Sequence, residues 1–275
     1  MNTKASALLL SATLLAGTLT SLRAQAPEPA PAPGPAPAPT PAGPSWSYVL
    51  TTSVASQYMF RGARLGGPSF QPSLECDYGN FALGVWVSTP LADKVPGQSD
   101  PEVDPYASYT IALNENLSLA PGFTWYTYPR ADLGAGFYRG TFEPSLALNC
   151  TVGALKVTPK LYYDFVLKGP TWELNLAYTV PLKELGTELD FAGTVGTFKW
   201  TESVRNADPK VKNTGDYYFA GVSAPFVISK QSKIVVGAAW TKGSNNFFKA
   251  GSAPKVENTA AVGRGVFTLN YVVTF

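Results

Sequence analysis

Apolar and polar residues alternate along most of the chain after residue 45. This alternation, a period of two residues, is clear at 117–128 and 172–180. Successive side chains of a β-strand point to opposite faces, so this period predicts strands rather than helices. The clearest case is the C-terminal segment, in which every second residue is large and apolar: Phe267, Leu269, Tyr271, Val273 and Phe275.

The alternation predicts twelve strands, most of them 8–13 residues long. A tilted strand needs about 9–11 residues to cross a bilayer, and a closed barrel with both termini on one side needs an even number of strands. After the N-terminal leader, no run of 18 apolar residues predicts a membrane helix. The predicted strands are 47–61, 69–79, 81–88, 104–113, 117–128, 140–150, 155–166, 171–182, 188–200, 216–228, 233–241 and 263–275.

The connections between these strands alternate in length. Odd-numbered connections are long, at 89–103, 129–139, 201–215 and 242–262, and most even-numbered ones are short turns. Outer-membrane barrels have short periplasmic turns and long extracellular loops. A soluble β-sandwich, the alternative reading of the same strands, has no reason to sort its loops in this way. Two connections weaken the rule, because 167–170 is odd but short and 183–187 is even but of middling length.

The aromatic residues agree with a membrane barrel. Trp125, Trp172, Trp200 and Trp240 fall at the long-loop ends of their strands, and Trp86 lies close to such an end. Membrane barrels carry a girdle of aromatic residues at each interface. The sequence therefore predicts an all-β fold, a transmembrane antiparallel β-barrel of about 12 strands over 45–275. The residues expected at the short-turn ends are Tyr48, Tyr78, Phe81 and Phe275.

The first 44 residues differ from the rest. Lys4, an apolar stretch and a small residue at Ala24 predict a secretory signal peptide over 1–24, with a membrane anchor as the alternative. Residues 27–44 alternate Pro with Ala, which predicts an extended periplasmic spacer over 25–44, either a tether or a ligand for a partner. These features predict a Gram-negative bacterial protein of the outer membrane, secreted by way of a cleaved signal peptide.

Composition narrows the function classes. The chain has no His, which removes the commonest general base and metal ligand together. Its two cysteines, Cys76 and Cys150, lie on strands that are not neighbours, so a disulfide is not expected. Lys and Arg number 21 against 19 Asp and Glu, and two of the cations, Lys4 and Arg23, lie in the leader. We therefore expect no catalytic residues, no metal, no cofactor and no nucleic-acid partner.

If the apolar faces meet lipid, the polar faces line the lumen. Charged residues occur regularly on those faces, with eight acids and three bases, which predicts a weak preference for cations or neutral solutes. The charged residues assigned to the lumen are Arg61, Glu75, Asp77, Asp104, Glu143, Lys156, Lys160, Asp164, Glu173, Glu188 and Asp190, and the aromatic ones are Tyr106, Tyr126, Tyr128 and Tyr162.

Arg61 is expected to end the first strand and face Glu75 and Asp77 across the first hairpin. Such a cluster either narrows the pore or is an ordinary ion pair of the wall. Lys156 and Lys160 are expected to pair with a third acid, Glu173. The lumen tyrosines either guide solutes by stacking or fill space, because a twelve-strand barrel lies between filled eight-strand barrels and open sixteen-strand ones.

The N-terminal part of the predicted barrel resembles a known family. The segment 54–62 (VASQYMFRG), followed by Gly67-Pro68 and by Asp77-Tyr78, resembles the opening motif of the TorF-type porin family, long labelled Gcw-chp. The segments 125–129 (WYTYP) and 141–143 (TFE) resemble its middle region. The resemblance is taken to span 45–275 and implies an outer-membrane porin-like protein without catalytic residues. The Pro/Ala spacer departs from the family pattern.

The leading functional hypothesis is a porin-like channel for passive diffusion of small hydrophilic solutes. A non-conducting structural or surface-interaction barrel that acts through its long loops is the alternative, and a barrel enzyme is disfavoured by the absence of His. The expected partners are outer-membrane lipid, lipopolysaccharide, small hydrophilic solutes and the barrel-assembly machinery. That machinery would read a C-terminal signal containing Tyr271 and Phe275; no oligomeric state is predicted.

Overall fold

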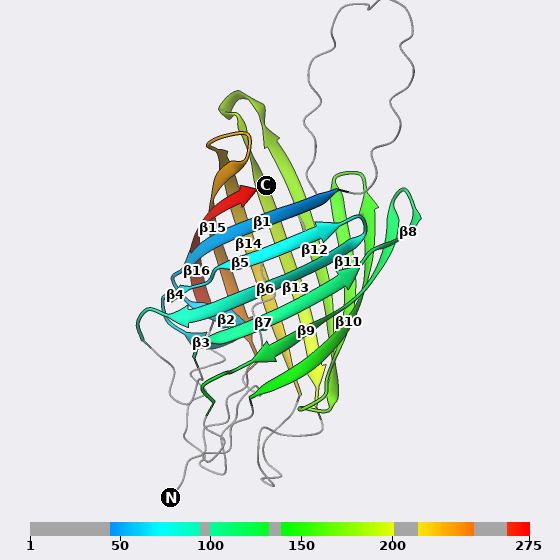
Figure 1. Ribbon diagram of the computed structural model, residues 1–275, viewed down its shortest axis with the longest axis vertical. Coiled ribbons are helices and arrows are strands. Elements are labelled where there is room, and N and C mark those ends of the chain that lie inside the picture. The colour runs from blue at the N-terminus through cyan, green and yellow to red at the C-terminus, as the bar shows by residue number, and fades with distance from the viewer. Residues whose placement is uncertain (1–44, 94–99, 132–138, 201–213, 245–262) are drawn as a thin grey trace, which may run out of the picture.

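A computed structural model describes residues 45–93, 100–131, 139–200, 214–244 and 263–275. The signal peptide and the Pro/Ala spacer lie outside the described residues, so both stay predictions. The described chain is a closed antiparallel barrel, in which each strand pairs with its neighbours and the last strand pairs with the first (Figure 1). The prediction of an all-β barrel of about twelve strands is confirmed.

The wall consists of twelve strands, two of which are interrupted. The second wall strand is made of β4 and β5, and the fourth of β7 and β8. In chain order the wall is β1 (Trp46–Ala55), β4 (Ser69–Phe70), β5 (Ser73–Tyr78), β6 (Phe81–Pro90), β7 (Glu102–Tyr109), β8 (Ile111–Asn114), β9 (Leu117–Thr127), β10 (Gly140–Val152), β11 (Leu155–Asp164), β12 (Gly169–Leu182), β13 (Thr187–Lys199), β14 (Thr214–Val227), β15 (Ser232–Gly243) and β16 (Arg264–Thr274).

The period of two in the sequence sorts side chains between the two faces of this wall. Outward-facing apolar side chains such as Leu74, Leu176 and Leu269 are 45%, 41% and 55% exposed. Cross-strand partners lie on the same face, so an apolar residue meets apolar neighbours around the ring. A continuous exposed apolar band of this kind is the surface that a membrane-spanning barrel presents to lipid.

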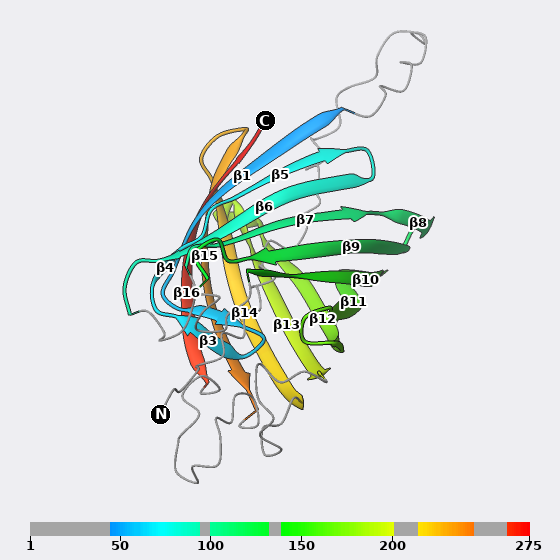
Figure 2. The ribbon, with the colours of Figure 1, turned by 60° about the horizontal axis from the view of Figure 1, so that its bottom comes forward.

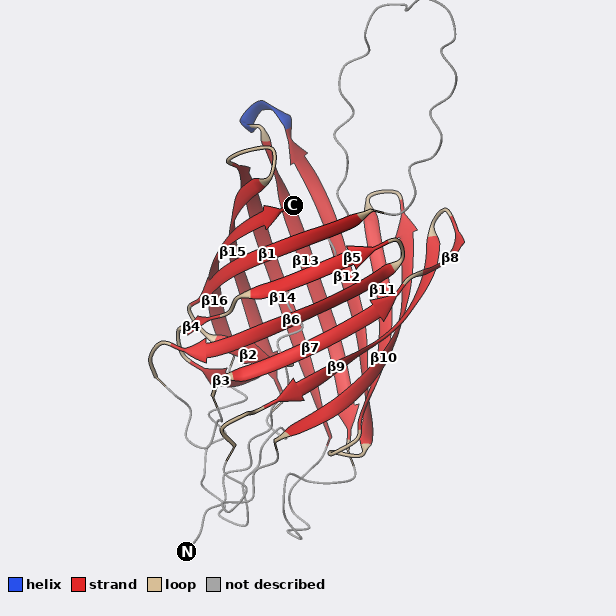
Figure 3. Ribbon diagram, in the orientation of Figure 1, coloured by secondary structure: helices blue, strands red, loops and turns tan. Residues whose placement is uncertain are grey.

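The two ends of the barrel differ in their connections. At one end, short turns join neighbouring strands, and the connection 183–186 contains the 3-10 turn η1 (Lys183–Leu185) (Figure 3). At the other end the connections 91–101, 128–139, 200–213 and 244–263 are longer, and much of each lies outside the described residues. We call these the turn side and the loop side. In the described part of the chain, no helix is long and apolar enough to span a membrane.

A second, two-stranded sheet lies inside the ring. After β1 the chain forms β2 (Tyr58–Phe60) and β3 (Ala63–Gly66), which pair only with each other, before it rejoins the wall at β4 (Figure 2). We call β2, β3 and the turn between them the inner hairpin. Its side chains are largely buried although it belongs to no wall strand, because they contact the inner face of the barrel.

The inner hairpin corrects the predicted first strand. The sequence predicts one strand over 47–61, but β1 ends at Ala55. Arg61 therefore does not end a wall strand and does not face Glu75 or Asp77. The last part of the predicted strand is extended, as β2, but its neighbour is β3 rather than the wall.

Two tryptophans also differ from their predicted place in an aromatic girdle. Trp125, Trp172 and Trp240 are 52%, 55% and 47% exposed, as a girdle requires, whereas Trp86 and Trp200 are 2% and 5% exposed. Both point inward, where their rings pack among the side chains around the inner hairpin. On the turn side, the predicted girdle residues Tyr48, Tyr78, Phe81 and Phe275 are all exposed.

Candidate functional site

The candidate site is centred on Arg61 at the tip of the inner hairpin. Phe60 pairs with Ala63, so Arg61 and Gly62 form a two-residue turn, with φ of 43° and 77°. Positive φ at both central residues is the geometry that suits tight hairpins, and it favours Gly at the second of these positions. A Cβ on Gly62 would lie 2.3 Å from the backbone nitrogen of Gly243 in β15, so the tip reaches the wall by backbone contact.

The Arg61 guanidinium is buried against two carboxylates from the wall. Its Nη1 and Nη2 donate to Oε1 and Oε2 of Glu143 at 2.9 and 2.8 Å, a two-point pairing that matches the planar fork of arginine. Its Nε lies 3.6 Å from Oε1 of Glu173, and Nη1 lies 3.5 Å from the Thr171 hydroxyl. The Arg61 and Glu143 side chains are 1% or less exposed.

Three tyrosines hold these carboxylates in place. Tyr126 donates to Oε2 of Glu143 at 2.8 Å, Tyr162 donates to Oε2 of Glu173 at 2.7 Å, and Tyr217 donates to Oε1 of Glu173 at 2.6 Å. The Arg61 carbon Cζ also lies 4.5 Å from the centre of the Tyr162 ring, within the range of a cation–π contact. We call Arg61, Glu143, Glu173, Tyr126, Tyr162 and Tyr217 the arginine site.

A glycine positions Tyr217. Gly196 on β13 lies directly opposite Tyr217 on β14, and a Cβ there would meet the Tyr217 ring at 2.1 Å. The ring therefore lies flat over the glycine, and its hydroxyl extends toward Glu173 on the next strand. Gly84 and Tyr106 repeat the arrangement on β6 and β7, where the Tyr106 hydroxyl donates to Oε2 of Glu75 at 2.9 Å.

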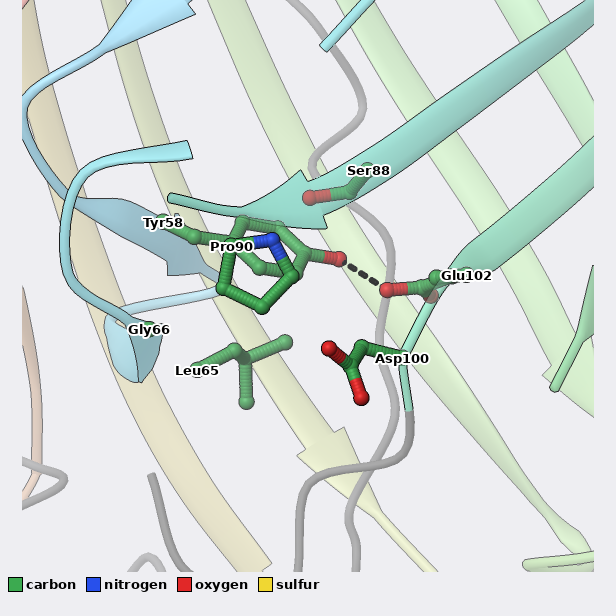
Figure 4. Close-up of a pocket in the computed structure, with 7 residues that line it drawn as sticks. All are labelled: Tyr58, Leu65, Gly66, Ser88, Pro90, Asp100 and Glu102. Atoms are coloured by element: carbon green, nitrogen blue, oxygen red, sulfur yellow. Dashed lines mark hydrogen bonds between the residues drawn. The ribbon is translucent and has the colours of Figure 1, made fainter. Parts of the chain in front are cut away.

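Apolar contacts and a third buried carboxylate, that of Glu102, hold the rest of the inner hairpin. The Tyr58 ring lies 5.7 Å from the Trp86 ring, and the Tyr58 hydroxyl donates to Glu102, which also accepts from Tyr128 at 3.2 Å. Figure 4 shows Tyr58 pointing toward Glu102 beside a cavity of about 10 Å³. That volume holds about one water molecule, so the loop-side interior is filled at this point. The buried apolar cluster comprises Tyr58, Phe60, Ala63, Leu65, Trp86, Leu167, Phe198, Trp200 and Tyr217.

The turn-side half of the interior has a different lining. Asn149 donates to Ser118 at 3.2 Å and accepts from Thr158 at 3.3 Å, and Asn175 accepts from Thr194 at 2.7 Å. These small polar side chains are partly exposed, unlike the buried residues around Arg61. They are bonded to one another along the wall and leave polar groups facing the enclosed space.

The predicted lumen residues divide between these two halves. Arg61, Glu143, Glu173, Tyr126 and Tyr162 meet in the arginine site, and Lys160 lies opposite Glu173 with Nζ 4.6 Å from the Tyr162 ring. Asp104 and Asp164 are buried on the loop side; Asp164 accepts from Thr141 and from two backbone N–H groups of the next turn. The residues toward the turn side are Glu75, Asp77, Tyr106, Lys156, Glu188 and Asp190.

Two predicted contacts are corrected. Arg61 pairs with Glu143, 82 residues away, because the hairpin turns into the barrel and presents the side chain to β10. Lys156 lies opposite Ala177 and is exposed, so of the two lysines only Lys160 is level with Glu173.

Asp190 accepts from Thr179 at 2.7 Å. Cys76 and Cys150 are both free. Within the described ranges, no three His, Cys, Asp or Glu side chains gather into a set that can hold a metal ion.

Sequence reasoning missed Tyr58, Phe60, Glu102 and Tyr217. Tyr58 and Phe60 were assigned to the first wall strand, so their contribution to an inner hairpin was not considered. Tyr217 precedes Tyr218 and Phe219, and only the register separates the inward from the outward ring. The signal for a hairpin in the sequence is Gly62 after Arg61, between the short apolar run 58–60 and the short segment 63–66.

Known proteins with a similar sequence or fold agree with this architecture. Residues 40–167 match the model of a family described as "Bacterial protein of unknown function (Gcw_chp)", so the predicted family resemblance is confirmed over this range. The name TorF and the resemblance beyond residue 167 stay predictions. No curated protein matches the chain.

Two solved porins share the fold. The NanC porin is 10% identical with a TM-score of 0.52, and the match covers 82% of this chain and 98% of that one. The KdgM porin is 14% identical with a TM-score of 0.52, over 83% of this chain and 99% of that one. At such low identity the likeness shows the fold alone.

Proposed function

We propose that this protein is an outer-membrane channel through which small hydrophilic solutes diffuse passively, with the inner hairpin as its constriction. The exposed apolar band and the aromatic residues at both ends support a position in a membrane. Within that membrane the partners are lipid and lipopolysaccharide. The barrel-assembly machinery would read the C-terminal Tyr271 and Phe275, which are 46% and 64% exposed on β16 and at its end.

One observation carries the proposal: the two halves of the interior have different linings. A barrel that served only as a scaffold has no need of a turn-side interior of partly exposed Ser, Thr and Asn side chains. Polar groups facing an enclosed space need water or each other as partners. The lining therefore supports a water-filled vestibule that leads to the hairpin.

The charges of the vestibule support a weak preference for cations. Glu75, Asp77, Glu188 and Asp190 lie on the inner face of the turn-side half, against Lys156 and Lys233. A surplus of negative charge in a confined space raises the local concentration of cations. No step of this function requires a catalytic residue or a cofactor.

The test is planar-bilayer conductance of the mature protein and of a variant without the inner hairpin. The Tyr58 N–H donates to the Gly67 carbonyl at 3.1 Å, so the ends of the hairpin are close and a short Gly-Ser link can replace 58–66. We expect small discrete steps from the intact protein and larger steps from the variant, with a cation-leaning reversal potential in a salt gradient. If both proteins are assembled and heat-modifiable yet neither conducts, the channel proposal is wrong.

The second candidate is a non-conducting barrel that acts through its loops. The buried contacts around Tyr58 and Glu102, with a cavity of about 10 Å³, favour it, because they fill the loop-side interior. It predicts no current from the intact protein. Current from the variant alone would mean that the hairpin closes a barrel that is otherwise able to conduct.

A further inference from the structure

The wall part of the arginine site is organised without the hairpin. Glu143 is oriented by Tyr126, and Glu173 is oriented by Tyr162 and Tyr217, through hydrogen bonds of 2.6–2.8 Å. All five residues belong to wall strands from β9 to β14. The carboxylates therefore keep their positions when the hairpin tip moves, and they form a preformed acceptor for a cation.

Arg61 occupies this acceptor with one nitrogen poorly matched. Its Nη atoms pair with Glu143, but the buried Nε makes no hydrogen bond and its nearest carboxylate oxygen, on Glu173, is 3.6 Å away. The main chain limits any adjustment, because Arg61 has φ of 43° and Gly62 is in contact with Gly243. A guanidinium free of the chain can satisfy both carboxylates, since the group has five N–H donors in a fixed fork.

Charge balance links the hairpin tip to a replacement cation. Arg61 forms an ion pair with both Glu143 and Glu173, and the nearby Lys160 lies opposite Glu173 with its Nζ 4.6 Å from the centre of the Tyr162 ring. Withdrawal of Arg61 would leave two buried carboxylates with one ammonium. An uncompensated buried charge is strongly unfavourable, so the withdrawn state is stable only when another cation enters.

We propose that Glu143 and Glu173, oriented by the hydroxyls of Tyr126, Tyr162 and Tyr217, bind the guanidinium group of a cationic solute over the Tyr162 ring, and that Arg61 is the intramolecular occupant of this site. The two-point pairing on Glu143 and the ring stacking on Tyr162 select a planar guanidinium over an ammonium. The solute binds only where Arg61 has left, so it favours the withdrawn tip. This inference rests on the proposed channel function and names the class of cation that acts on it.

The experiment compares L-argininamide with L-citrullinamide on the full-length mature barrel. The two molecules share the α-amino group, and in citrullinamide an uncharged ureido group replaces the guanidinium. In the wild-type protein Arg61 competes for the site, so argininamide acts only at a concentration about tenfold or more above the one that acts on Arg61→Gly, and citrullinamide has no effect. Arg61→Gly keeps the positive φ without strain and empties the site, so this variant conducts without ligand. In that variant argininamide blocks the current at a concentration about tenfold or more below that of citrullinamide, because only the guanidinium side chain forms charge-assisted hydrogen bonds with the two carboxylates.

Two variants on the Arg61→Gly background locate the block. Glu143→Gln removes one of the two carboxylates and weakens the block by argininamide. Glu115→Gln removes an equal charge from the exposed turn between β8 and β9 and leaves the block unchanged. If Arg61→Gly does not assemble, Arg61→Asn replaces it, since Asn also tolerates positive φ.

The outcomes separate this inference from the channel proposal. Equal block by the two probes, together with equal shifts in the melting temperature of Arg61→Gly, overturns the guanidinium site and leaves the channel standing. If no variant conducts, the channel proposal fails. A larger rise in the melting temperature with argininamide than with citrullinamide would then still establish the binding site.

Discussion

The two halves of the barrel interior differ in how deeply their side chains are buried and in what they bond to, although the same strands build both. On the loop side, Arg61, Glu143 and Tyr126 are buried and bonded across the lumen. On the turn side, Asn149, Asn175 and their neighbours are partly exposed and bonded only along the wall. The inner hairpin makes the difference, because it brings apolar and charged side chains to one half and nothing to the other. We therefore expect substitutions in the buried loop-side half to reduce stability. We expect the charges of the partly exposed turn-side half to set the electrostatic potential inside the barrel.

The largest expected effect is from Glu143→Ala, which leaves the Arg61 charge buried with only a loose contact to Glu173. Removing one partner of a buried ion pair costs about 3–5 kcal/mol. We expect this loss in the free energy of unfolding, measured by urea titration in lipid, together with a higher open probability. Adding Arg61→Gly to Glu143→Ala should recover part of the loss; an additive double variant would contradict the coupling of the two residues.

The second-largest loss of stability is expected from Gly62→Ala, which tests the contact between the hairpin tip and the wall without changing any charge. A non-glycine residue at φ of 77° costs about 1–3 kcal/mol, and the new Cβ would also meet the Gly243 backbone. The tip should lift from the wall and the conductance should rise. Gly153→Ala, at φ of 60° in an open turn on the turn side, is the matched control, with strain but no contact and no change in conductance.

A smaller effect is expected from Tyr217→Phe, which keeps the ring over Gly196 and removes one hydrogen bond to Glu173. A hydrogen bond to a charged group contributes about 1.5–3 kcal/mol. Stability should fall by that order, measured by the same urea titration. Tyr218→Phe, at the outward-facing neighbour, should leave stability nearly unchanged; an equal loss at both positions would contradict the inward orientation of Tyr217.

The smallest effect on stability, and a clear effect on selectivity, is expected from Asp190→Asn in the turn-side half. Asn keeps an acceptor for Thr179, so the free energy of unfolding should change by no more than about 0.5 kcal/mol. Loss of a negative charge lowers the local concentration of cations, so the reversal potential in a salt gradient should move away from the cation-selective side. No shift, in a protein that conducts, would mean that the turn-side acids do not face the conducting path.

The wall was predictable because its signal is local and repeated. The alternation at 263–275 and 172–180 predicts that every second side chain is apolar and faces outward, and the strand pairing in the structure agrees with this. The hairpin was not predictable in the same way. The segment 54–60 follows directly on the first wall strand and is rich in apolar and aromatic residues, and whether such a segment pairs with β16 or turns inward depends on partners distant in sequence. The same reason explains Trp86 and Trp200, whose sequence positions match a girdle but whose rings point toward the hairpin.

The sequence by itself determined the all-β class, the twelve-strand wall, the two faces of each strand and the inward placement of Glu143 and Glu173, because a period of two fixes the direction of every side chain once the strand exists. Only the tertiary structure decided what Arg61 binds. Closing the ring brings β10 and β12 within reach of a tip that lies 82 residues before Glu143, and no local pattern encodes a contact of that separation. The wall could be predicted because its pattern is local, whereas the arginine site forms only when the closed ring brings distant strands to the hairpin tip.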